Sequence, residues 1–132
     1  NQVFLGKLMD KIYPSFIQAS GLETTSLSRD PEVVRAYEED SLVHDKISAR
    51  LFVGMYESGF WALENAAEFP MPLLLVHGSE DKITSAKGSE EFAEKVGERA
   101  ALKIWDGFYH ETHNEPEYAE VFKVTIEWLD SL

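Results

Sequence analysis

The sequence contains no cysteine, which excludes disulfide bonds, thiolate nucleophiles and zinc sites built from cysteine. It also lacks an apolar run near the ~18 residues that cross a membrane, and no signal peptide is visible. Basic residues are scarce, because 12 lysines and arginines stand against 24 acids and give a net charge of −12. Such a surface repels phosphate backbones, so we expect no nucleic-acid partner. With no cysteine and no visible signal peptide, we expect a cytoplasmic protein, free or peripheral to a membrane.

The first half of the chain is dominated by helical patterns. The 132 residues are enough for one ordinary domain, and an apolar fraction of 44% is typical of a globular protein. Apolar residues recur at helical spacing over residues 4–12 and 46–66, and Asp30-Pro31 is typical of a helix start. The sequence therefore predicts helices joined by loops as far as about Pro70–Pro72.

The second half changes to alternating strands and helices. The run PLLLVHG, residues 72–78, is typical of a strand buried on both faces. A helix is predicted over 85–96, a second strand over 101–105, and a last helix over 114–132 with Pro116 in its first turn. The buried stripe of that last helix is expected to comprise Tyr118, Val121, Phe122, Thr125, Leu129 and Leu132. This order predicts an α/β fold with parallel strands, a right-handed crossover and flanking helices.

Two residues with acid–base chemistry follow the two predicted strands. Asp81 comes after the first strand and His110 after the second. Because the carboxyl ends of parallel strands meet at one edge of a sheet, we expect the two side chains to lie close together. A neutral imidazole acts as a base near pH 7, and a carboxylate on its other ring nitrogen fixes its tautomer. We therefore predict that His110 is the base and acid, oriented by Asp81.

Three segments resemble a known family. PLLLVHGSEDKIT and DGFYHETHNEPE are similar to the acid-bearing and histidine-bearing segments of α/β-hydrolases of the monoacylglycerol lipase and lysophospholipase group, and LSRDPEVVRAYEEDSLVHDKISARL resembles their cap. The resemblance covers the chain from about residue 4 to the end. It implies that residues 1–69 form a helical cap over an apolar passage and that residues 70–132 form the carboxyl-terminal part of the hydrolase core. It also implies that Asp81 and His110 are catalytic.

One part of the family pattern is absent. The family uses a triad in the order Ser, Asp, His, with the serine in Gly-x-Ser-x-Gly, and no such pentapeptide occurs here. The resemblance places that serine and the oxyanion loop upstream of the cap, and the chain begins with Asn1 rather than methionine. We therefore expect this chain to be the carboxyl-terminal half of a larger enzyme. We expect the isolated chain to be inactive and to associate with the missing amino-terminal half or with itself, as in a swapped dimer.

The resemblance implies a serine hydrolase of acyl esters. Its substrates would be monoacylglycerols, lysophospholipids or similar lipid-like esters, and its chemistry needs no metal or organic cofactor. A non-catalytic interaction module derived from a hydrolase is an alternative, as is a peptidase or thioesterase on the same scaffold.

Each candidate residue also has a simpler interpretation. Asp81 is compatible with a turn residue and His110 with a structural loop histidine, while His77 favours a structural role. His113 competes with His110 for the role of base. The HETH segment differs from the zinc motif His-Glu-x-x-His, because Asn114 stands where the second histidine is needed. We therefore predict no metal site.

Overall fold

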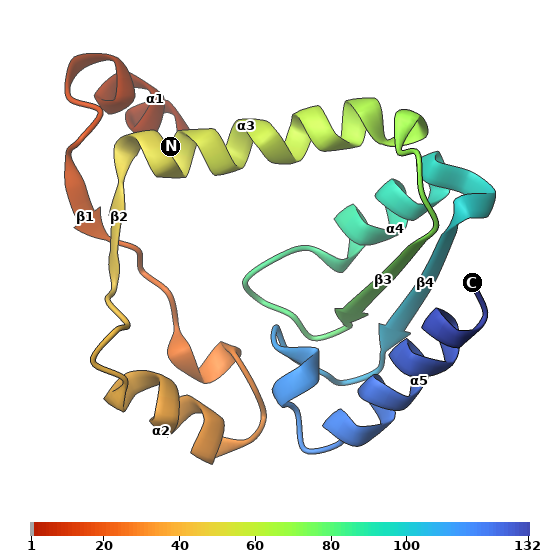
Figure 1. The fold of residues 1–132 in the computed structure, drawn as a ribbon. Helices are drawn as coiled ribbons and strands as arrows, with labels where there is room; N and C mark the ends of the chain where they lie inside the picture. The colour runs from red at the N-terminus through yellow and green to blue at the C-terminus, as the bar shows by residue number, and fades with distance from the viewer. Residues whose placement is uncertain (1) are drawn as a thin grey trace.

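The computed structural model describes residues 2–132. Its helices and strands are α1 (Gln2–Ile12), β1 (Ile17–Ala19), α2 (Pro31–Glu39), β2 (Lys46–Ser48), α3 (Ala49–Asn65), β3 (Leu73–Gly78), α4 (Ala86–Val96), β4 (Ala100–Trp105) and α5 (Tyr118–Asp130), with short 3-10 turns that include η1 (Thr24–Ser26) and η4 (Thr112–Asn114). The long helix α3 connects an amino-terminal part, made of α1, α2 and a small β ribbon, to a carboxyl-terminal part that contains β3, β4, α4 and α5 (Figure 1). None of the helices in the described range is long and apolar enough to cross a membrane.

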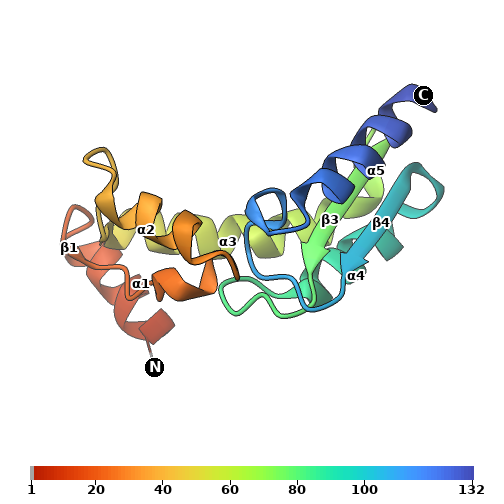
Figure 2. The ribbon, with the colours of Figure 1, turned by 90° about the horizontal axis from the view of Figure 1, so that it is seen from below.

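The carboxyl-terminal part has the predicted α/β architecture. Strands β3 and β4 pair in parallel, from Leu73 opposite Ala100 to Gly78 opposite Trp105, and α4 connects them. Helices α4 and α5 lie on opposite sides of this two-stranded sheet (Figure 2). The predicted fold class and the parallel pairing are therefore confirmed. Both strands end at the same edge of the sheet, where the loops that follow them meet.

The amino-terminal part packs on α3. Gly6 lets α1 approach α3 closely, because a Cβ at that position would come within 2.9 Å of the Phe52 ring. The predicted start of α2 is confirmed, since the Asp30 side chain accepts a hydrogen bond from the Glu32 N–H at 2.9 Å and Pro31 follows it. The assignment of residues 1–69 as a cap stays a prediction.

Two predicted helix starts are wrong. The helix expected from residue 46 begins at Ala49, because residues 46–48 form β2 and pair antiparallel with β1. The last helix was expected to include Pro116 and begins at Tyr118. Glu115 is extended, with φ −75° and ψ 159°, a conformation that the residue before a proline favours. Helix α5 therefore begins only after Glu115, which is buried and extended.

Burial is lower than the sequence pattern predicts. The strand β3 was expected to be buried on both faces, but its residues 73–77 are only half-buried. Of the stripe expected on α5, Val121 is buried, whereas Phe122 and Leu129 are about half exposed. A sheet of two strands offers too little surface to cover the helix. The buried apolar residues are Leu27, Ala49, Val53, Ala66, Val96, Phe108 and Val121.

Candidate active site

The candidate site forms where the loops after β3 and β4 meet. The Nδ1 atom of His110 lies 2.9 Å from Oδ2 of Asp81. The Asp81 side chain is 2% exposed and the His110 side chain 33% exposed, so the acid is buried and the histidine reaches the surface. The predicted contact between these two residues is present, and their catalytic role stays a prediction.

Gly78 explains why the two loops come so close. A Cβ at this last residue of β3 would lie 2.2 Å from the carbonyl oxygen of Phe108 and 2.3 Å from that of Tyr109. The Glu80 N–H donates a hydrogen bond to the Phe108 carbonyl oxygen at 3.0 Å. The absence of a side chain at residue 78 therefore lets the loop that carries His110, here called the histidine loop (residues 106–111), cross directly over the end of β3.

The turn after β3 keeps Asp81 ionised. Its Oδ1 atom accepts hydrogen bonds from the N–H groups of Ile83 at 2.7 Å and Thr84 at 2.9 Å, and its Oδ2 atom accepts one from the Thr84 hydroxyl at 2.7 Å. Burial raises the pKa of Asp81, but the hydrogen bonds from Thr84, His110 and Ile83 outweigh it and lower the pKa from 3.8 to about 2. Asp81 is therefore a carboxylate at neutral pH and attracts the Nδ1–H of His110.

A second histidine shares the same carboxylate oxygen. The Nε2 atom of His77 lies 3.0 Å from Oδ2 of Asp81, and its Nδ1 atom lies 2.8 Å from the Ser89 hydroxyl. Ser89 donates to Nδ1 when Nε2–H donates to Asp81. The sequence favoured a structural role for His77 but did not indicate this contact. The only sequence feature that pointed to the contact is the spacing of four residues between His77 and Asp81, across the tight turn after β3.

The geometry leaves one nitrogen of His110 available for chemistry. When Nδ1–H donates to Asp81, Nε2 carries the lone pair of the neutral ring. No hydrogen bond to this Nε2 occurs within residues 2–132. His113, the competing candidate, is exposed in η4 and makes no hydrogen bond or ion pair with Asp81 in that same range. Between positions 2 and 132, no three His, Cys, Asp or Glu side chains are arranged to hold a metal ion.

An apolar groove of about 820 Å³ ends at this site. It lies between α3 on one side and β3 and α4 on the other. The lining residues are Met55, Tyr56, Gly59, Phe60, Leu63, Leu75, His77, Ile83, Thr84, Ser85, Gly88, Ser89 and Phe92. His77 and Thr84 both line the groove and contact Asp81, so an apolar ligand in the groove would place one end near the Asp81–His110 pair.

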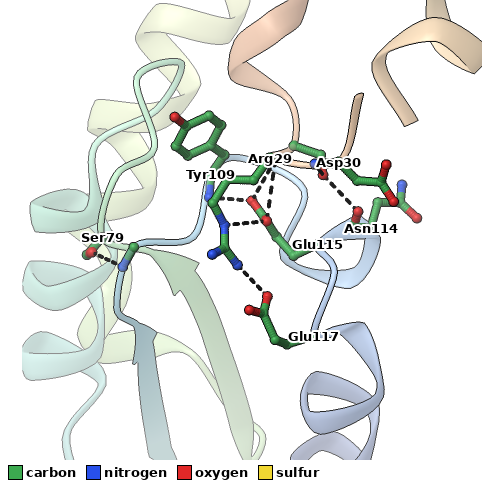
Figure 3. A network of polar contacts seen from close by, with 9 residues as sticks. Arg29, Asp30, Ser79, Tyr109, Asn114, Glu115 and Glu117 are labelled. Carbon is green, nitrogen blue, oxygen red and sulfur yellow. Dashed lines mark hydrogen bonds and ion pairs between the residues drawn. The ribbon is translucent and has the colours of Figure 1, made fainter. Parts of the chain in front are cut away.

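A second polar cluster contacts Tyr109, the residue before His110 in the loop after β4 (Figure 3). Its centre is Glu115, whose side chain is fully buried and accepts hydrogen bonds from the Arg29 Nε–H and the Tyr109 N–H, each at 2.7 Å. Arg29 also bonds to Glu117 and lies over the Phe108 ring, 4.7 Å from its centroid. Burial lowers the pKa of Arg29, but its interactions with Glu115 and Glu117 outweigh this and raise it. Sequence reasoning missed this cluster, because Glu115 resembled an ordinary acid at a helix start.

Two proteins similar to this chain are monoacylglycerol lipases. The crystal structure of a monoacylglycerol lipase from Paleococcus ferrophilus matches 98% of this chain with a TM-score of 0.92 and 35% sequence identity, and the match covers 51% of that protein. A monoacylglycerol lipase of Mycolicibacterium smegmatis is 36% identical over 131 residues, which are 98% of this chain and 46% of that enzyme. The chain thus spans about half the length of these two relatives.

Two further matches concern the family itself. An uncharacterized abhydrolase domain-containing protein of Dictyostelium discoideum is 36% identical over 127 residues, 95% of this chain and 14% of that protein. The family model described as serine aminopeptidase, S33, matches residues 1–117, nearly the whole chain. The parallel strand pair, its flanking helices and these matches lead to one assignment: the chain belongs to the serine aminopeptidase S33 family of α/β-hydrolases.

Proposed function

We propose that this chain is part of a serine hydrolase of carboxylic esters, in which Asp81 and His110 are two members of a Ser-His-Asp triad. The observation that carries the proposal is the 2.9 Å contact between His110 Nδ1 and Asp81 Oδ2, with Nε2 of the same ring left available. The serine would come from a segment outside these 132 residues, because no Gly-x-Ser-x-Gly occurs among them.

The proposed reaction has two steps. The serine oxygen attacks the ester carbonyl carbon while His110 Nε2 takes the serine proton, and the imidazolium then gives that proton to the leaving alcohol as the C–O bond breaks. Water attacks the resulting acyl-enzyme, loses a proton to Nε2, and the acid leaves as the serine regains its proton. Throughout, Asp81 holds the Nδ1–H tautomer and stabilises the positive charge on the ring.

The proposed substrates are monoacylglycerols, lysophospholipids or similar acyl esters. Two relatives that are at least 35% identical to this chain over the matched region are named monoacylglycerol lipases. The groove supports the same class, because its wall is largely aliphatic and aromatic and it ends beside Asp81. An acyl chain lying between α3 and β3 would therefore bring its carbonyl carbon toward His110.

A peptidase is the second candidate, because the matching family is described as a serine aminopeptidase. An aminopeptidase must bind the charged amino terminus of its substrate, for which a carboxylate is the natural partner. The side chains that line the groove include no acid. This composition favours an ester with an apolar tail over a peptide.

The test uses the whole protein that contains this chain, with His110→Ala and the matched control His113→Ala. Initial rates are measured on a long-chain monoacylglycerol and on an aminoacyl anilide. We expect ester hydrolysis to be the faster reaction, His110→Ala to lower kcat by about 10³-fold or more, and His113→Ala to leave kcat within about twofold.

Three results would count against the proposal. Faster cleavage of the anilide would establish the peptidase. Equal ester rates for His110→Ala and the unmodified protein would remove His110 from the mechanism. If neither the unmodified protein nor His110→Ala hydrolyses either substrate, and both fold and bind a partner equally well, the result supports the non-catalytic interaction module.

A further inference from the structure

The loop that carries His110 is held from two sides. On one side it crosses the end of β3 at Gly78, as described above. On the other side it docks onto residues 26–28, which precede α2. The Glu111 N–H donates to the Leu27 carbonyl oxygen at 2.8 Å, and the Ser28 hydroxyl donates to the Asn114 carbonyl oxygen at 2.8 Å. The position of the histidine therefore depends on a segment more than 80 residues away in the sequence.

Glu115 is the buried centre of this second contact. Its carboxylate accepts from the N–H of Tyr109, the residue directly before His110, and from Nε of Arg29, which directly precedes the Asp30 cap of α2. Figure 3 shows Glu115 between the two partners. A buried ion pair adds little net stability compared with apolar residues of the same volume, so we interpret this pair by the geometry that it fixes.

We propose that Glu115 is a positioning residue for His110. It connects the Tyr109 backbone to Arg29 and thereby holds the histidine loop at the distance that aligns Nδ1–H with Asp81. This inference rests on the proposed role of His110 as the base. A displacement of about 1 Å in such a group can cost about 100-fold in rate, so a loop held on one side only would be a poor support for it.

The chain offers a matched pair of variants. Glu115→Gln keeps the size of the side chain, but it replaces one carboxylate oxygen with an NH2 group. Tyr109 and Arg29 donate to different oxygens of Glu115, so one of them loses its acceptor. Glu117→Gln likewise neutralises an acidic partner of Arg29. The Glu117 side chain is 50% exposed and bonds to Arg29 without reaching Tyr109.

Two readouts separate positioning from simple structural support, both measured on the whole protein. The first is the far-downfield proton resonance of His110 Nδ1–H, identified by its absence in His110→Ala. The second is the division of the effect between kcat and KM for a monoacylglycerol. We expect Glu115→Gln to weaken or remove the resonance and to lower kcat by about 10-fold or more, with KM within about twofold. Glu117→Gln should leave both readouts unchanged.

A second variant covers the case in which Glu115→Gln does not fold. Arg29→Lys removes the Nε–H that donates to Glu115 and keeps the positive charge at residue 29. It should shift the same resonance and lower kcat by about 2-fold to 5-fold. An unchanged resonance and kcat in a folded Glu115→Gln protein would overturn the inference. If that variant is unfolded, unchanged values in Arg29→Lys would overturn it instead.

The outcome is separable from that of the proposed function. If the whole protein hydrolyses no ester, the proposed function fails. The Nδ1–H resonance would still report whether Glu115 holds His110 against Asp81.

Discussion

The carboxylate of Asp81 is nearly excluded from water and is nevertheless ionised. Its two oxygens accept three hydrogen bonds from the turn that follows it, through the N–H groups of Ile83 and Thr84 and the Thr84 hydroxyl. These donors are local in sequence, so they hold the carboxylate independently of the loop that carries His110. His110 and His77 both contact its Oδ2 atom.

The pKa of Asp81 predicts how the stability of the protein depends on pH. The folded-state pKa of about 2 lies below the ordinary value of 3.8 for Asp, so the folded protein binds fewer protons than the unfolded chain between these two pH values. The carboxylate therefore contributes roughly 2 kcal/mol above about pH 4, and this contribution is lost as the pH falls toward 2. This contribution is measured by urea unfolding of the unmodified protein and of Asp81→Asn at several pH values.

We expect the difference in unfolding free energy between these two proteins to be largest near pH 6 and to shrink steadily below pH 4. Asp10→Asn is the control, because it makes the same substitution at an acid outside the site, which forms an ion pair with Arg50. A difference that is constant from pH 6 to pH 3 would contradict the assignment of an ionised, hydrogen-bonded Asp81.

At the scale of elements, α3 has two different faces. Gly59 lines the apolar groove, whereas Gly54, on the same helix, does not. A Cβ added at either position meets no atom within 4 Å. The two glycines therefore offer a matched pair for testing whether the groove receives the acyl chain.

Gly59→Leu should shorten the groove and discriminate by chain length. In the whole protein, we expect kcat/KM for a long-chain monoacylglycerol to fall by about 10-fold or more, while a short-chain ester stays within about twofold. Gly54→Leu gains the same helix propensity, about 1 kcal/mol, without entering the groove, so its kcat/KM values should not change. Equal losses on both esters, or equal effects of both variants, would mean that the acyl chain lies elsewhere.

The comparison of predicted and observed elements shows where sequence patterns lose information. The helices and both parallel strands follow from local periodicity, and their starts and ends were predicted within a few residues. Strand β2 was missed because its partner β1 lies about 30 residues earlier, and three residues carry no period of their own. The start of α5 was wrong because a tertiary contact, that of Glu115, holds the chain extended before Pro116.

In the candidate site, too, some contacts follow from local sequence patterns and others depend on distant segments. Asp81 and His110 were predictable because each follows a strand and parallel strands end at one edge. Arg29 and Glu115 are 86 residues apart, and neither lies in a pattern that indicates the other. The contact of His77 with Asp81 depends on the tight turn after Gly78, which the sequence marks only by the glycine. Pairing between distant segments is the part that a single sequence does not encode locally.

At the scale of the whole molecule, much apolar surface is exposed. Helix α5 exposes Tyr118, Phe122, Ile126 and Leu129, and Leu132 after its end is exposed as well. The sheet of β3 and β4 has a free edge on each strand in the described residues. Monomeric soluble proteins rarely expose a contiguous apolar surface of this kind, and unpaired strand edges recruit other strands. In the relatives that are twice as long, additional chain is available to cover such a surface.

We therefore predict that the 132-residue chain, expressed alone, associates with itself. Sedimentation velocity at micromolar concentration should show a dimer or larger species, because burying the α5 face removes apolar area from water at about 25 cal/mol per Å². The double variant Phe122→Glu and Leu129→Glu should shift the chain toward monomer. The control Ala119→Glu and Ser131→Glu adds the same charge at exposed positions of α5 and its end without removing an apolar side chain. A monomer at every concentration would show that this surface is stable in water, and equal shifts from both double variants would attribute the effect to charge.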